Sequence, residues 1–220
     1  MKPFILLLSA AFLSTASLSA CSESNKMSIQ QQTEARFKLN PEPKQAYRVR
    51  IKINDAPGPM KLVSDLNIGY IAPNCSYVIS RLAGARANPE KKVSSKIDQI
   101  GQDEYESIFY LDAVLDEDYF GEGVCRWQTY GFGLAFQATG KPEETFFNFG
   151  YDIDNGVIEK KTLTRYYQKR GYPYYKNEDG LPYGSKDSPD IDFGRDAITD
   201  YSPELRNNLF SITVTLEEVK

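Results

Sequence analysis

Residues 210–216 read FSITVTL, an alternation of large apolar side chains with serine and threonine. Because successive side chains of a β-strand point to opposite faces, this pattern predicts a strand with one buried face. Within residues 124–138 the same rule puts Tyr130 on one face with Phe132, Leu134 and Phe136. Further strands are predicted over residues 47–53, 61–71, 75–82, 93–100, 105–111, 144–153 and 156–169.

About seven to nine strands with little helical periodicity predict an all-β domain, namely an antiparallel β-sandwich of which an immunoglobulin-like fold is one form. Residues 54–59 and 83–90 are predicted loops because they are rich in glycine, proline and asparagine. Residues 171–204, called the excursion below, show little periodicity and predict a long irregular surface segment. Ser202 and Pro203 fit the cap and first position of one helical turn.

The N-terminus has the composition of an export signal. Lys2 precedes an apolar stretch of about ten residues, which is too short to span a bilayer. The following LSAC, ending at Cys21, resembles a bacterial lipobox, so residues 1–20 are expected to be a signal peptide and Cys21 a lipidated N-terminus; an ordinary signal cleaved near a cysteine is the alternative. Ser22, the residue after the expected lipidated cysteine, resembles the signal that directs a lipoprotein to the outer membrane. Polar residues 21–44 are predicted to be a flexible tether, followed by a single domain over residues 45–220.

Histidine is absent from the chain, which excludes a Ser-His-Asp triad, a Cys-His dyad and any histidine-ligated metal site. Of the three cysteines, Cys75 and Cys125 remain once Cys21 is assigned to lipid. In an exported chain they are expected to form one disulfide, with two free thiols as the alternative. There are 30 acidic against 26 basic residues and no basic stripe, so no nucleic-acid partner is expected.

An acidic turn is predicted over residues 116–123, and its carboxylates together with Asp112 fall within eleven residues. It contains Asp116, Glu117, Asp118 and Tyr119 in succession. Three interpretations stay open: a solvated loop, a calcium site built from clustered carboxylates, or a protein-binding face in which aromatic residues lie among acids. The spacing does not fit the regular calcium-loop pattern, so no metal and no cofactor are predicted.

The second candidate is the tyrosine-rich stretch of residues 165–184, which includes the first part of the excursion, because tyrosine and arginine often dominate the energetics of protein interfaces. Tyr172, Tyr174 and Tyr175 are its predicted partner-binding residues. Packing over the sandwich and carbohydrate stacking are the alternatives. A glycosidase with paired carboxylates would need no histidine, but nothing in the sequence indicates one. Motifs for a nucleophile elbow, a phosphate loop or a dinucleotide site are missing.

Three segments together resemble a known group: NDAPGP (54–59), YLDAVLDEDYFGEGVCRW (110–127) and SPELRNNLFSITVTLEE (202–218). They are similar to small lipoproteins of Gram-negative bacteria that are associated with immunity to antibacterial toxins of contact-dependent secretion systems. Such toxins are often lipases or cell-wall hydrolases. The resemblance covers roughly residues 46–220 and brings no catalytic motif with it.

The resemblance implies a non-enzymatic protein on the periplasmic face of the envelope, held by lipid in the outer membrane. Its expected partner is a cognate protein toxin, which it would neutralise by direct binding. The alternatives are a structural or accessory envelope lipoprotein and, less favoured, a carbohydrate-binding or carbohydrate-active module.

Overall fold

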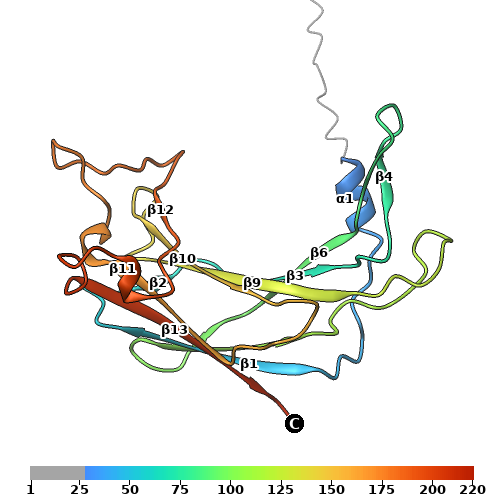
Figure 1. The fold of residues 1–220 in the computed structure, drawn as a ribbon, viewed down its shortest axis with the longest axis horizontal. Coiled ribbons are helices and arrows are strands. Elements are labelled where there is room, and N and C mark those ends of the chain that lie inside the picture. The colour runs from blue at the N-terminus through green and yellow to red at the C-terminus, as the bar shows by residue number, and fades with distance from the viewer. Residues whose placement is uncertain (1–27) are drawn as a thin grey trace, which may run out of the picture.

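The computed structural model of the protein describes residues 28–220, and the predicted signal peptide and Cys21 lie outside this part. Two β-sheets face each other as an open sandwich (Figure 1). The strands are β1 Ala46–Asn54, β2 Lys61–Leu62, β3 Leu66–Ile71, β4 Tyr77–Ser80, β5 Ala85–Ala87, β6 Glu90–Ser95, β7 Asp98–Gln99, β8 Glu104–Tyr110, β9 Gln128–Gln137, β10 Phe146–Asp152, β11 Thr162–Gln168, β12 Ile191–Asp192 and β13 Leu209–Glu218. The helical elements are α1 Ile29–Glu34 and the 3₁₀ turns η1 Lys169–Gly171 and η2 Ile198–Asp200.

The five-stranded sheet has the order β11-β13-β1-β8-β7, with antiparallel neighbours throughout. Its long central pair aligns Val49 of β1 with Leu216 of β13, so the alternating apolar residues of both strands share one face. That face is turned inward: Val49, Ile51 and Val214 are completely or almost completely buried. The predicted half-buried strands at 47–53, 105–111 and 210–216 are confirmed.

The six-stranded sheet has the order β12-β10-β9-β3-β6, and β2 pairs with β9 beside this path. β12 runs parallel to β10, whereas the other pairs of this sheet are antiparallel. Its inner face completes a core that is rich in aromatic rings. The inward rings of this sheet are Tyr70, Phe132, Phe136, Phe147, Phe149 and Tyr151.

Tyr130 departs from the predicted pattern. It was expected on the same face as Phe132, but its side chain is exposed. The register between β3 and β9 shifts at this point, because Gly69 pairs with Gly131 whereas Tyr70 pairs with Thr129. A β-bulge of this kind inserts one extra residue and turns the following side chains over.

Residues 83–90 were predicted to be a loop, but they contain β5 and the start of β6. β4 and β5 form a small separate hairpin, called the β4–β5 hairpin below. Gly84 takes a positive φ of 62° in its turn, a conformation that glycine adopts without strain. Residues 202–208 form successive hydrogen-bonded turns instead of the predicted helical turn, and Ser202 binds the side chain of Glu204.

The predicted tether over residues 21–44 is wrong for the part that the structure describes. Ser28 caps α1 in a capping box with Gln31. Phe37 is only 4% exposed and belongs to the core, and Leu39 pairs with Val114 in a β-bridge. One apolar ring in a polar segment therefore fastens residues 28–44 to the sandwich.

The predicted disulfide between Cys75 and Cys125 is confirmed. It joins the segment after β3 to the segment before β9, two neighbours in one sheet. It therefore differs from the immunoglobulin disulfide, which links the two sheets. Within residues 28–220, no helix is long and apolar enough to cross a membrane.

Candidate functional site

The acidic turn uses Asp118 to hold its own backbone. Its Oδ1 accepts hydrogen bonds from the backbone N–H groups of Phe120 (3.2 Å), Gly121 (2.6 Å) and Glu122 (3.2 Å). Desolvation alone would raise the pKa of Asp118, but these backbone donors outweigh it and lower the pKa below its usual value. The Asp118 carboxylate is therefore an acceptor inside the turn.

Asp116 and Glu117 connect the turn to neighbouring segments. Asp116 Oδ1 accepts a hydrogen bond from the backbone N–H of Trp127 at 2.9 Å, and its Oδ2 lies 3.4 Å from Nη1 of Arg126. Glu117 forms an ion pair with Lys38, with 2.8 Å between Oε2 and Nζ. Both carboxylates therefore face partners in their own chain.

Tyr119 is a half-buried packing residue. Its ring meets Phe37 edge-on at 5.1 Å and Trp127 at 6.3 Å between centroids. Its hydroxyl donates a hydrogen bond to the carbonyl of Leu115 at 2.7 Å. These rings belong to the aromatic cluster, which we define as Phe37, Tyr77, Tyr119, Phe120 and Trp127.

The acidic turn does not have the arrangement of a cation site. No group of three or more histidine, cysteine or carboxylate side chains within residues 28–220 is placed to hold a metal ion. The oxygens of Asp116 and Asp118 instead face backbone N–H donors. The solvated-loop interpretation therefore fits these carboxylates best.

The excursion is tied to the sandwich at its base. Tyr172 donates a hydrogen bond from its hydroxyl to the carbonyl of Pro59 at 2.8 Å, and the carbonyl of Pro173 accepts one from the N–H of Thr145 at 3.0 Å. Tyr175 donates its hydroxyl at 2.9 Å to Asp192 Oδ2 in β12, the strand of the excursion that pairs with β10. Burial, followed by the charge of Asp192, raises the pKa of Tyr175. The excursion is thus anchored through tyrosine hydroxyls.

Beyond this base the excursion exposes large apolar side chains. Tyr183 is 73% exposed and Phe193 61% exposed, and Leu181 and Ile191 are exposed as well. Monomeric proteins rarely expose several large apolar side chains close together unless the surface binds something. Tyr174, predicted as a contact residue, lies half-buried between Pro173 and Tyr175.

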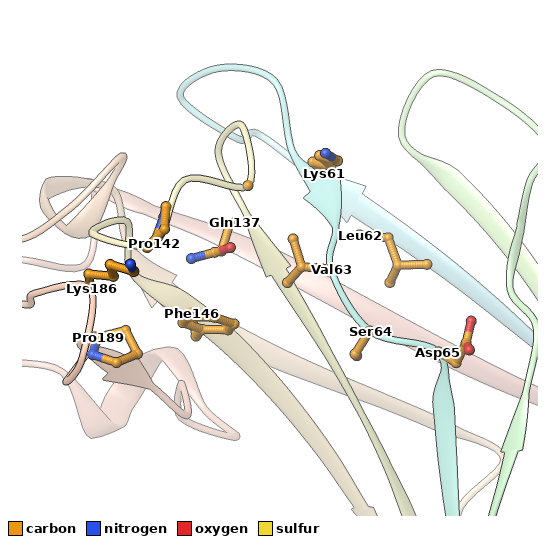
Figure 2. A pocket seen from close by; sticks show the side chains of 11 residues that line it. Lys61, Leu62, Val63, Ser64, Asp65, Gln137, Pro142, Phe146, Lys186 and Pro189 are labelled. Atoms are coloured by element: carbon orange, nitrogen blue, oxygen red, sulfur yellow. The ribbon is translucent and has the colours of Figure 1, made fainter. Parts of the chain in front are cut away.

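Two hollows border the excursion. The larger, about 730 Å³, lies between the excursion, β2 and the ends of β9 and β10 (Figure 2). Lys61 of β2 and Lys186 of the excursion lie on its rim, and Phe146 forms part of its floor. The second, about 560 Å³, is lined by Arg170, Tyr175, Lys176, Tyr183 and Asp190.

The charges around the two hollows are mostly positive. Lys61, Lys186, Arg170 and Lys176 line them, against the carboxylates of Asp65 and Asp190. Arg170 also lies 5.9 Å from the ring centroid of Tyr175, within range of a cation–π contact. The hollows therefore offer cations next to aromatic rings, which suits an acidic surface.

The loop over residues 138–145 supports the larger hollow through one buried carboxylate. Glu144, 3% exposed, accepts hydrogen bonds from the backbone N–H groups of Thr139 (2.7 Å) and Gly140 (2.9 Å) and from the Thr139 hydroxyl (2.6 Å). Burial alone would raise the pKa of Glu144, but these donors outweigh it and lower the pKa. The Glu144 carboxylate thus fixes the loop that carries Gly140 and Pro142 to the hollow.

The two predicted contact regions lie at opposite ends of the sandwich (Figure 1). The α1 end consists of residues 28–44, the β4–β5 hairpin and residues 111–127. The excursion end consists of residues 55–60, 138–145 and the excursion. The structure therefore brings Tyr172, Tyr174 and Tyr175 together, but it keeps them apart from Asp116–Tyr119.

Sequence reasoning did not single out Leu181, Lys186, Ile191 and Phe193 within the excursion, nor Lys61 beside the excursion end. Leu181, Lys186, Ile191 and Phe193 lie inside the predicted excursion, so its length was a usable signal. Nothing local marked Lys61, which reaches this end only because β2 pairs with the end of β9. Comparisons with protein-family models, curated proteins and solved structures each found no match to this chain.

Proposed function

We propose that this protein is a lipid-anchored, non-enzymatic binding protein of the periplasm that neutralises a cognate antibacterial toxin with its excursion end. The lipid anchor rests on the lipobox-like LSAC at Cys21, and the immunity role rests on the resemblance of the three segments described above. Cys21 keeps the protein at the outer membrane, in the compartment where a delivered lipase or cell-wall hydrolase acts.

The observation that carries the choice of surface is the exposure of two aromatic rings of the excursion, Tyr183, which lines the second hollow, and Phe193. Large aromatic side chains bury much area on binding at little entropic cost, so they often supply most of the binding energy. Neither ring is needed for the core, which other residues fill. Binding energy at the excursion end is therefore separable from folding.

The charged side chains that line the two hollows favour carboxylates on the part of a partner that enters them, although the excursion as a whole has more acidic than basic residues. Lys61, Lys186, Arg170 and Lys176 surround the hollows. Positive side chains that meet carboxylates of a partner add local electrostatic complementarity, which fixes specificity and register. The acidic turn is less suited to steering a basic toxin, since Asp116, Glu117 and Asp118 already have partners in their own chain.

The anchored base of the excursion supports tight binding. Tyr172 and Tyr175 hold it by their hydroxyls, and Glu144 fixes the neighbouring loop. A surface that is already ordered loses less conformational entropy when it binds. Tyr172 and Tyr175, which were predicted as contact residues, thus position the exposed rings of the excursion.

The test is protection of living cells. Candidate toxins encoded beside the gene are exported to the periplasm together with the full-length protein, and growth is measured. The double variant Tyr183→Ala, Phe193→Ala is expected to lose protection and co-purification of the toxin while keeping its free energy of unfolding. Val124→Ala, which shortens an exposed apolar side chain at the α1 end, is the matched control and is expected to protect.

Three outcomes would contradict the proposal in different ways. Full protection by the double variant would show that the excursion end is not the contact surface. Absence of protection by the unsubstituted protein, with co-purification of envelope assembly components, would favour an accessory role. Binding or turnover of cell-wall glycans would favour the carbohydrate-active alternative.

A further inference from the structure

The β4–β5 hairpin carries exposed apolar side chains at the α1 end. Leu82 at its turn is fully exposed, and Val78 and Ile79 are 39% and 42% exposed. The hairpin is not part of either large sheet. These side chains therefore contribute little to the core, and the fold holds them out into solvent.

The charge of the hairpin is positive. Arg81 and Arg86 are the charged residues of the stretch YVISRLAGARA, residues 77–87, which has no acidic residue. Arg86 is held at the base of the hairpin by Ser76 and lies 3.5 Å from Glu122. Arg81 lies next to Leu82 at the turn, so a cation and a large apolar side chain occupy the tip together.

The hairpin lies beside α1, where the described chain begins. Burial raises the pKa of Tyr77 in β4, and the nearby charge of Glu34 in α1 raises it further. Tyr77 also stacks on Phe120, which contacts Phe37 just after α1. The hairpin tip and the start of α1 extend from the sandwich in the same direction (Figure 1).

The chain length before α1 limits how far this end can stand from an anchor at Cys21. Seven residue steps separate Cys21 from Ser28, and a fully extended chain spans at most about 25 Å over that number. Residues 28–44 give no further slack because Phe37 and Leu39 fasten them to the sandwich. A lipid at Cys21 would therefore hold the α1 end close to the bilayer.

We propose that the β4–β5 hairpin is a second membrane contact, in which Leu82 enters the interface of a phospholipid bilayer and Arg81 meets its anionic headgroups. This inference rests on the proposed lipidation of Cys21. Apolar side chains at a membrane interface are stabilised because they leave water, and adjacent cations add attraction to anionic lipids.

The test places a fluorescent reporter at the hairpin tip. The full-length protein is purified from membranes and reconstituted into vesicles of phosphatidylethanolamine and phosphatidylglycerol with brominated acyl chains, which quench tryptophan on contact. Leu82→Trp is expected to lose most of its added emission. Leu181→Trp, an exposed leucine at the excursion end, is the matched control and is expected to keep its emission. The unsubstituted protein gives the background of Trp127, the one tryptophan of the chain.

Mass spectrometry of the N-terminal peptide tests the lipid anchor at Cys21 separately from the membrane contact of the hairpin. If Cys21 carries acyl chains and Leu82→Trp is not quenched, the membrane contact is overturned while the anchor stands. If Cys21 carries none, both fall. If Leu82→Asp abolishes toxin protection without quenching of Leu82→Trp, the hairpin binds protein and the inference is wrong. Quenching in a protein that gives no protection would support the membrane contact and contradict only the immunity role.

Discussion

The two ends of the sandwich hold their loops in different ways. At the α1 end, a disulfide and the aromatic cluster fasten the acidic turn, and rings such as Phe37 and Tyr119 pack against each other. At the excursion end, the loops are held by hydrogen bonds from Tyr172 to Pro59 and from backbone N–H groups to Glu144. Packing of one ring against another buries aromatic surface, whereas a hydrogen bond from a tyrosine hydroxyl leaves other rings exposed.

This difference shows that aromatic residues alone do not identify a binding surface. Both ends are rich in tyrosine and phenylalanine, but Tyr119 meets two other rings at the α1 end, whereas Tyr183 is 73% exposed at the excursion end. A ring that is packed inside a cluster has little exposed surface left to contact a partner. The α1 end is therefore expected to govern stability, and the excursion end to govern recognition.

Removing the disulfide should have the largest effect on stability. Cys75 and Cys125 are 50 residues apart, and the chain-entropy model gives about 4 kcal/mol for closing a loop of that length. The double variant Cys75→Ser, Cys125→Ser is expected to lose about that much free energy of unfolding, measured by urea titration. Below its melting temperature it should still protect cells against the toxin.

Reduction of the unsubstituted protein with dithiothreitol is the control and should cause a similar loss. The side chain of Asn74 forms hydrogen bonds with the backbone of Val124 and of Arg126, on either side of Cys125. These local contacts remain when the disulfide is removed. An unchanged urea midpoint would show that these hydrogen bonds hold the α1 end without the disulfide. Loss of toxin protection in a folded double variant would contradict the division between the two ends.

A middle-sized effect is expected at the excursion end from Glu144→Gln. The glutamine keeps one acceptor oxygen but places an NH₂ group opposite backbone N–H donors of Thr139 and Gly140. Leaving buried polar groups unsatisfied typically costs about 1–3 kcal/mol. Glu143→Gln, at the half-exposed neighbouring position, is the matched control and should lose much less.

The Glu144 contribution should also depend on pH. Its pKa in the folded protein lies below the ordinary value of 4.5, so folding favours the ionised carboxylate. The stabilisation is complete above pH 4.5 and is lost as the pH falls through the folded pKa. Urea titrations across pH 3–7 should therefore show the difference between the unsubstituted protein and Glu144→Gln shrinking at the acid end. If the difference in the free energy of unfolding stayed constant with pH, the shape of the Glu144 side chain, and not its ionisation, would stabilise the loop.

Much of the sandwich could be predicted from alternation, because a buried face repeats every second residue whatever the neighbouring strand is. Tyr130 was misplaced because a bulge depends on the pairing of β9 with β3, which the sequence of β9 does not contain. Residues 28–44 were read as a tether because their composition is polar. A single ring, Phe37, was enough to dock them, since it enters a cluster formed by residues far along the chain.

The candidate site was predictable in part. The length and tyrosine content of the excursion marked it as a contact region, but the sequence could not show which of its rings are used as anchors. Tyr172 and Tyr175 anchor, whereas Phe193, which was not singled out, is exposed. The acidic turn looked like a charged surface because a run of carboxylates does not reveal that backbone N–H groups are the partners of Asp118.

The smallest effect is expected from Glu117→Gln, and it gives a direct test of whether the acidic turn recognises a partner. Glu117 pairs with Lys38, and both side chains are partly exposed to water, so the ion pair adds little stability. The hydrogen bond and the charge of Glu117 raise the pKa of Lys38, and in the variant this pKa should return toward its ordinary value, as followed by NMR titration.

Toxin protection by Glu117→Gln should equal that of the unsubstituted protein, and Lys38→Gln should behave in the same way because it breaks the same pair from the other side. The comparison with Tyr183→Ala, Phe193→Ala decides between the ends, since none of these substitutions removes a core residue. If Glu117→Gln loses protection while its urea midpoint stays unchanged, a carboxylate at the α1 end contacts the toxin. The α1 end would then recognise the partner in addition to stabilising the fold, and its proposed position against the bilayer would have to leave room for that partner.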